Sequence, residues 1–263
     1  MNSSVRHGAT ILLWAVVMSV SASAATGLHI SDAEADRIGR KIWRNECGGT
    51  KDGLTSWNKG EDFPSLGIGH FIWYPEGRRG PFKESFPELR DYLRAQGVKL
   101  PAWLANAGAC PWPDRSAFLA DINGPRLSGL RDLLADTVGL QARFAALRLE
   151  KALPRMLASA PSGQREKIRA NFYRVAAAPG GLYALMDYVN FKGEGTAPSE
   201  RYKGKGWGLM QVLADMDEKG SPTAAFARSA DRVLARRVEL SPPERGEKRW
   251  LPGWRNRVAT YAD

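Results

Sequence analysis

The fold is decided by the stretch from Ser31 to His70, SDAEADRIGRKIWRNECGGTKDGLTSWNKGEDFPSLGIGH. It begins with Ser31 followed three residues later by Glu34, the capping-box pattern that opens a helix. Apolar residues then recur at helical spacing: Ala35, Ile38 and Ile42. The pair Gly48-Gly49 is typical of a helix end. We therefore predict a helix that begins after Ser31 and ends at Gly48.

The end of this helix carries a carboxylate. Glu46 follows Ile42 by four residues, so it lies close to the apolar stripe in the last turn and should be half inside the protein. Between Leu54 and Ile68 the pattern changes to short extended pieces around turn residues, which predicts a small hairpin or a three-stranded ribbon. The segment Gly67-Ile68-Gly69-His70 closes this region.

The rest of the chain has mainly helical patterns. Several helices are expected between residues 115 and 175, separated by Gly124-Pro125 and by residues 161–163. Further helices are predicted at three places: 88–96, 181–189 and 222–238, the last capped by Ser221. No internal repeat or linker divides the chain. We predict a single α+β domain over residues 25–263, mostly helical with one small sheet near the N-terminus.

Composition excludes several classes of protein. The 263 residues are 43% hydrophobic and 25% charged, which is ordinary for a globular chain and does not fit a disordered, collagenous or multi-span membrane protein. Two cysteines exclude a disulfide-dense scaffold. With only three histidines, a metal site is not expected, and no cofactor is implied.

The first residues have the order of a secretory signal. Arg6 precedes the apolar run 11–18, and the small residues Ala22-Ser23-Ala24 follow it. We expect a signal peptide over residues 1–24, cleaved after Ala24, although a retained N-terminal anchor is the alternative. Loss of Arg6 leaves a net charge of +9. A periplasmic or secreted location is then expected, with anionic envelope polymers as partners rather than nucleic acid, and with no stable membrane anchor; alternatively, the charge serves solubility alone.

The order of glutamate, ribbon and glycine motif resembles a known superfamily. Glu46 at a helix end, followed by the segment from Ser65 to His70, is similar to the phage-type pattern of the lysozyme-like superfamily. Farther along, the segment Gly206–Val212 looks like the Gly-Leu-Met-Gln segment of lytic transglycosylases in that superfamily. The resemblance implies a lysozyme-like fold and cleavage of peptidoglycan glycan strands, with Glu46 as the acid.

The chain also departs from the phage-type pattern. Asn58 and Lys59 stand nearest the position of its hairpin aspartate, and Ser65 stands in place of its threonine. The resemblance makes Ser65 the water-positioning hydroxyl, with Asp62 or Glu61 as a substitute second carboxylate.

Glu194 is a rival for the acid, because it precedes Gln211 much as a transglycosylase glutamate precedes the glutamine segment. Cleaving a glycosidic bond needs a carboxyl group that keeps its proton near neutral pH, which burial among apolar neighbours promotes. This favours Glu46, because Glu194 lies in the polar turn 192–195.

Further residues are expected to bind the glycan or to hold the site. His70 packs under the ribbon near the acid, and Gln211 is a possible sugar contact. Aromatic rings stack on sugar faces, so four are assigned to the cleft: Trp57, Tyr74, Tyr202 and Trp207. Export favours a disulfide between Cys47 and Cys110, which would fasten the helix end beside Glu46.

The sequence therefore predicts a muramidase-type hydrolase with a single glutamate acid. A lytic transglycosylase that yields anhydro products and an inactive glycan-binding or scaffold protein are the alternatives. Hydrolase and transglycosylase are not distinguished by the sequence, nor are the oligomeric state and the position of cleavage along the strand.

Overall fold

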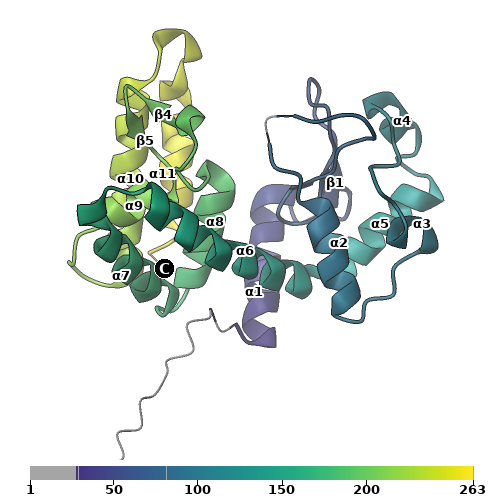
Figure 1. Ribbon diagram of the computed structural model, residues 1–263, viewed down its shortest axis with the longest axis horizontal. Coiled ribbons are helices and arrows are strands. Elements are labelled where there is room, and N and C mark those ends of the chain that lie inside the picture. The colour runs from purple at the N-terminus through teal and green to yellow at the C-terminus, as the bar shows by residue number, and fades with distance from the viewer. Residues whose placement is uncertain (1–27, 29, 81, 263) are drawn as a thin grey trace, which may run out of the picture.

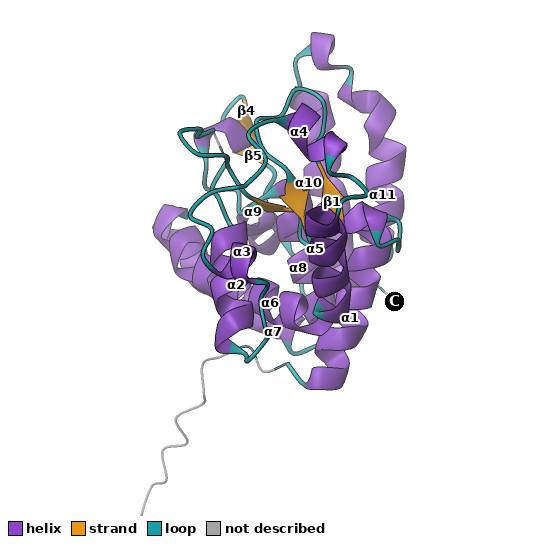
Figure 2. Cartoon of the chain, turned by 90° about the vertical axis from the view of Figure 1, so that its right-hand side faces the viewer, coloured by secondary structure: helices purple, strands orange, loops and turns teal. Residues whose placement is uncertain are grey.

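A computed structural model describes residues 28, 30–80 and 82–262, so the signal predicted over residues 1–24 lies outside the described residues. The chain is mostly helical, with a small antiparallel sheet near its start, as the sequence predicts. In the part of the chain that the structure describes, the strands form two small sheets among the helices (Figure 2). Within the described residues, no helix is both long and apolar enough to cross a membrane.

Helix α1 (Asp32–Cys47) has the predicted start and end. The Ser31 hydroxyl accepts a hydrogen bond from the Glu34 amide at 3.2 Å, which satisfies one free N–H of the first turn. At the other end Gly48 adopts a left-handed conformation with φ of 63°, and the Gly49 amide donates back to Trp43. The helix therefore ends at Cys47 with Gly48 as its C-cap, which fixes the position of Glu46 in the last turn.

The sheet near the N-terminus has three short antiparallel strands. After the 3-10 turn η1 (Asp52–Leu54) come β1 (Thr55–Ser56), β2 (Ser65–Leu66) and β3 (Phe71–Ile72), in the order β1-β2-β3. Ser65 lies opposite Ser56 on one side and Ile72 on the other. The predicted ribbon is therefore confirmed, and the glycine motif is the turn from β2 to β3.

Gly67 in this turn cannot carry a side chain. Its φ is 70°, and a Cβ would lie 2.3 Å from Gln141 Oε1. That same oxygen accepts a hydrogen bond from the Ile68 amide at 3.0 Å. The turn is thus fastened to a buried amide of the following long helix, which sets where His70 lies.

Two groups of elements flank that long helix, α6 (Val138–Ser159) (Figure 1). We name residues 51–136 the N-terminal lobe. Besides the sheet, its described residues form the helices α2 (Phe86–Ala95), α3 (Ala102–Ala105), α4 (Arg115–Ala120) and α5 (Pro125–Asp136). Helix α1 packs along α6. The breaks predicted at Gly124-Pro125 and at residues 161–163 are confirmed.

Residues 160–262 form the C-terminal lobe. Its elements are α7 (Arg165–Ala176), α8 (Gly181–Lys192), β4 (Arg201–Tyr202), β5 (Lys205–Gly206), α9 (Leu209–Asp215), α10 (Pro222–Leu240) and α11 (Leu251–Ala259). Short 3-10 turns join them: η2 (Ser162–Gln164), η3 (Pro198–Glu200), η4 (Pro243–Arg245) and η5 (Glu247–Trp250). Helix α8 is buried from Gly181 to Tyr188 and forms the centre of this lobe. The β4–β5 ribbon and α11 were not predicted.

Candidate functional site

Glu46 lies where three parts of the chain meet. Its side chain is 18% exposed, and its Oε1 is ion-paired with Arg257 Nη2 from α11. His70, in the turn before β3, places Nδ1 3.8 Å from the other carboxylate oxygen, Oε2. The predicted half-buried position is therefore confirmed. The neighbours differ from the apolar ones expected, because an arginine and a histidine face the carboxylate.

Arg257 is itself held by a buried carboxylate. Asp187 of α8, whose side chain is fully buried, accepts hydrogen bonds from Arg257 Nε at 2.7 Å and Nη2 at 2.8 Å. The Tyr261 hydroxyl donates to the same carboxylate at 2.5 Å. Burial lowers the pKa of Arg257, but Asp187 and Glu46 outweigh this effect and raise it above its ordinary value. The guanidinium therefore stays charged and ties α1 to α8 through α11.

These three residues, Arg257, Asp187 and Tyr261, were missed by sequence reasoning. Pro252 in the first turn of α11 is a helix-start signal that could have revealed the helix. No spacing rule relates Arg257 to Glu46, because 211 residues separate them in the chain. Burial, with the negative charge of Asp187, raises the pKa of Tyr261 well above its ordinary value, so this hydroxyl remains a donor.

The predicted disulfide is not formed. Cys47 and Cys110 are both free and buried. Cys47 Sγ lies 3.8 Å from the Gly67 carbonyl oxygen and 3.9 Å from His70 Nε2, so it packs against the glycine turn. Cys110 instead pairs through its backbone with the segment after β3, where its amide donates to the Tyr74 carbonyl at 3.0 Å. Cys47 and Cys110 therefore contact different parts of the chain.

Neither thiol is activated. Burial raises the pKa of Cys47 to about 12, and Glu46 adds to this effect. Burial likewise raises the pKa of Cys110 to about 12. A thiol in this state is a poor nucleophile. The contact of Cys47 with His70 therefore does not make a cysteine–histidine catalytic pair.

We predict that the native chain resists alkylation by iodoacetamide near pH 8, because both thiols are buried and protonated. After denaturation without reductant, both cysteines should be alkylated, as intact mass spectrometry would show. A denatured chain that takes up the reagent only after reduction would instead establish the disulfide.

The carboxylates of the ribbon are used elsewhere. Asp62 is two-thirds exposed and pairs with Arg78 at 3.0 Å. Glu61 accepts a hydrogen bond from the Asn58 side-chain amide at 3.2 Å. Ser65 is buried in the middle strand. No described contact brings any of these side chains to Glu46, so the expectation that they surround the acid is not met.

Glu194 lies in the C-terminal lobe, in the segment after α8. Arg155 of α6 donates to both of its oxygens, at 2.5 Å and 3.2 Å. The Glu194 backbone oxygen accepts from the Met210 amide, which docks α9 onto this segment. Both oxygens of the rival acid are thus engaged by an arginine, whereas Glu46 keeps Oε2 free of that interaction.

The transglycosylase-like segment has a packing role in this structure. Gln211 Nε2 donates a hydrogen bond to the Gly195 carbonyl at 3.0 Å. The side-chain amide of Gln211 packs so closely against Gly195 that a Cβ at this glycine would lie 1.9 Å from Gln211 Oε1. Trp207 is buried beneath the Arg237 guanidinium, which lies 4.1 Å from the ring centre. The Tyr202 hydroxyl donates to Glu247 at 2.8 Å. Trp207 is therefore not exposed to a glycan, contrary to expectation. Gln211 lines a second pocket, beside Met210 and Arg236, so its expected sugar contact stays a prediction.

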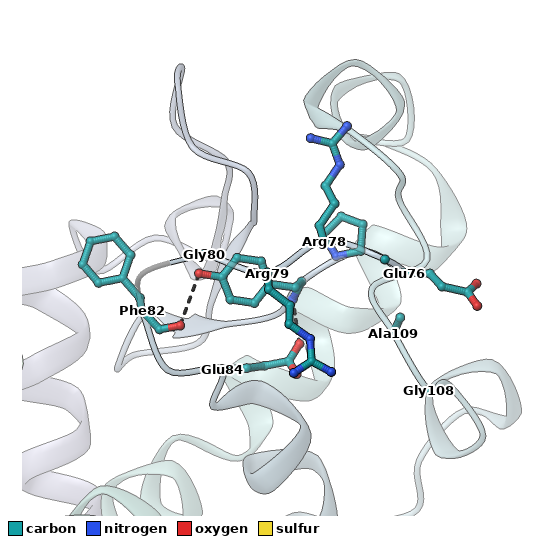
Figure 3. Close-up of a pocket in the computed structure, with 11 residues that line it drawn as sticks. Glu76, Arg78, Arg79, Gly80, Phe82, Glu84, Gly108 and Ala109 are labelled. Atoms are coloured by element: carbon teal, nitrogen blue, oxygen red, sulfur yellow. Dashed lines mark hydrogen bonds between the residues drawn. The ribbon is translucent and has the colours of Figure 1, made fainter.

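The two remaining aromatic residues lie in the N-terminal lobe. Trp57 is buried, donates its indole N–H to the Glu61 carbonyl, and packs edge-on against Phe118. It presents no face to a sugar, contrary to expectation. Tyr74 lines a pocket between the segment after β3 and the segment before α4 (Figure 3).

No protein-family model, curated protein or solved structure was found to match this chain. Among the described residues, no group of His, Cys, Asp and Glu side chains could hold a metal ion. The geometry around Glu46 is therefore the feature of this chain from which a function can be inferred.

A lysine near this site has an unusual environment. Lys192 Nζ lies 3.5 Å from the ring centre of Trp254 and 3.8 Å from that of Phe191. Burial, followed by the like charge of Arg237, lowers the pKa of Lys192 to about 7. Glu247 opposes this shift and Arg257 adds to it.

Replacing Lys192 with Met is expected to remove a pH dependence of stability. Between about pH 7 and the ordinary lysine pKa of about 10.4, the unfolded chain binds a proton that the folded chain lacks, so the free energy of unfolding rises with pH across this window. Urea unfolding near pH 6 and near pH 9 measures this rise in both chains. An equal change in wild type and Lys192→Met would contradict the shifted pKa.

Proposed function

We propose that this protein is a lysozyme-like glycosidase that cleaves the β-1,4 bonds of peptidoglycan glycan strands, with Glu46 as the acid. The observation that carries the proposal is the position of Glu46. A partly exposed carboxylate at the end of α1 lies beside the histidine of a Gly-Ile-Gly-His turn and is oriented by an arginine of the last helix.

The two oxygens of Glu46 have different tasks in this proposal. Oε1 is held by Arg257, which fixes the side chain, and Oε2 is the oxygen that can exchange a proton with a bound sugar. Proton transfer from Oε2 to the glycosidic oxygen breaks the bond and leaves an oxocarbenium-like sugar. Water then attacks this sugar and returns a proton to Glu46, which completes hydrolysis.

Transglycosylase chemistry is the second candidate, and one observation favours it. Arg257 contacts two carboxylates among the described residues, Glu46 and Asp187. Asp187 is fully buried and accepts hydrogen bonds from Arg257 and Tyr261. Asp62 and Glu61 pair with other side chains. The described contacts of Glu46 include no second carboxylate that could activate water. Glu46 would then act first as acid and then as base, while the sugar's own hydroxyl attacks.

Digestion of purified peptidoglycan sacculi tests the proposal. The wild-type chain should release soluble fragments, and their mass distinguishes the two reactions, because hydrolysis adds one water to the products and transglycosylation adds none. Sedimentation of the chain with intact sacculi and no released fragment would instead indicate an inactive glycan-binding protein.

A further inference from the structure

The N-terminal lobe has a pocket that the proposed chemistry at Glu46 does not use. Its volume is about 860 Å³, and it lies between residues 74–80, 82 and 84 on one side and Gly108 and Ala109 on the other (Figure 3). The volume falls in the range of sites for small ligands. A Cβ at Gly77 or Gly108 would have no atom within 4 Å, so no neighbouring side chain fills the pocket beside these two glycines.

The pocket presents a cation without a partner. Arg78 and Arg79 are both exposed, but only Arg78 forms an ion pair, with Asp62 at 3.0 Å. Within residues 30–80 and 82–262, no carboxylate pairs with Arg79. A guanidinium offers a planar set of donors that fits a carboxylate. Arg79 is therefore available to a ligand carboxylate.

An acceptor lies in the same pocket. Glu84 is half-buried, and its Oε1 accepts a hydrogen bond from the Tyr74 amide at 2.7 Å. That bond fixes the side chain, while no described hydrogen bond or ion pair uses Oε2. Arg79 and Glu84 both line the pocket, and the ends of their side chains lie in the same part of the view, whereas Glu76 points away from them (Figure 3). A ligand with both a carboxylate and an N–H donor would match this pair.

The pocket wall is held rigidly by aromatic contacts. The Tyr74 ring packs edge-on against Phe63 at 5.2 Å, and its hydroxyl donates to the Phe82 carbonyl at 3.3 Å. A Cβ on Gly80 would lie 2.5 Å from this hydroxyl, so a glycine is required there. The Phe82 ring is 58% exposed at one end of the pocket and offers an apolar surface to a ligand.

A short stretch of chain joins the pocket to the site at Glu46. Strand β3 begins directly after His70, and Tyr74 lies four residues after His70. The backbone from His70 to Tyr74 is about 13 Å long if it is extended. An extended peptide of four residues spans a similar length, about 13 Å. The described part of the segment before α2 lies on the side of the N-terminal lobe that faces the C-terminal lobe (Figure 1).

We propose that this pocket binds the peptide stem that peptidoglycan carries on its glycan strand, an inference that rests on the proposed function. Arg79 pairs with a stem carboxylate, and Glu84 Oε2 accepts a hydrogen bond from a stem amide or amine. The pocket thereby directs the enzyme to strands that still bear stems, because the peptide and the scissile bond are engaged together.

Binding of a free synthetic stem tetrapeptide to the full chain tests this assignment by calorimetry. Arg79→Gln should raise the Kd about 10-fold or more, because a charge-assisted hydrogen bond is lost. Arg78→Gln removes the same charge from the neighbouring residue, whose guanidinium is engaged by Asp62, and should leave the Kd near that of the wild type. The peptide amidated at its carboxyl groups should bind wild type and Arg79→Gln equally weakly. No binding by the wild type, or equal Kd values for Arg79→Gln and wild type, would overturn the assignment.

A cleavage assay separates this inference from the proposed function. On strands with stems, Arg79→Gln should raise KM with kcat unchanged, whereas on strands stripped of stems by an amidase it should match the wild type. Glu46→Gln should bind the free peptide normally. If the wild type cleaves neither substrate yet binds the peptide through Arg79, the proposed function fails and the pocket assignment stands. If cleavage occurs but Arg79→Gln changes KM on neither substrate, the pocket assignment fails alone.

Discussion

Replacing Glu46 with Gln is expected to slow cleavage of glycan strands roughly 10²- to 10⁴-fold, because the amide cannot donate the proton that the leaving oxygen needs. Gln has nearly the same size as Glu and keeps an oxygen that can accept from Arg257. Release of soluble fragments from sacculi measures the rate, and thermal unfolding shows that the variant is folded.

Glu194→Gln is the matched control. Glu194 is also a partly buried glutamate that is paired with an arginine, but it lies in the C-terminal lobe and Arg155 engages both of its oxygens. The rate of this variant should stay near that of the wild type. A Glu46→Gln chain that cleaves as fast as the wild type removes Glu46 from its role, and a collapse of activity in Glu194→Gln alone would transfer that role to the rival.

The second large effect is on stability. Asp187→Asn should lower the free energy of unfolding by about 3–5 kcal/mol, because it leaves the mostly buried Arg257 without its fully buried counter-ion. Asn also accepts hydrogen bonds from Tyr261 and Arg257 less strongly than a carboxylate does. Urea unfolding followed by circular dichroism measures the loss.

Asp231→Asn in α10 provides the comparison, because the arginine partner of Asp231 lies on α11, as Arg257 does. Asp231 pairs with Arg255 of α11 at 2.7 Å, but the two side chains are 40% and 52% exposed. Solvent screens such a pair, so the loss should be about 0–1 kcal/mol. Equal losses for Asp187→Asn and Asp231→Asn would show that the buried network around Arg257 does not hold α11 in place.

Local signals in the sequence predicted the elements that lead to the site. The start of α1 at Ser31 and its end at Gly48 follow from groups within a few residues of each other, so they could be read directly. The ribbon and the glycine turn were predicted for the same reason. These elements place Glu46 and His70 but do not reveal what else contacts them.

Expectations that depended on distant contacts had mixed outcomes. Trp57 and Trp207 are large rings with polar edges, a description that fits a sugar-binding surface and a packed core equally well. Only the positions of Phe118 and Arg237 decide that both rings are buried. The prediction of a disulfide was wrong for the same reason, because the positions of two cysteines in a sequence do not show where their side chains point.

By itself, the sequence determined the helical character of the chain, its small ribbon, and the position of one carboxylate at a helix end, because hydrogen bonds and side-chain periodicity over a few residues govern these features. The tertiary structure alone decided that Arg257 and Asp187 complete the surroundings of Glu46, and that Arg79 and Glu84 share a pocket. Such contacts arise when segments far apart in the chain are packed together by burial of their apolar faces, and no local pattern records which segments will meet.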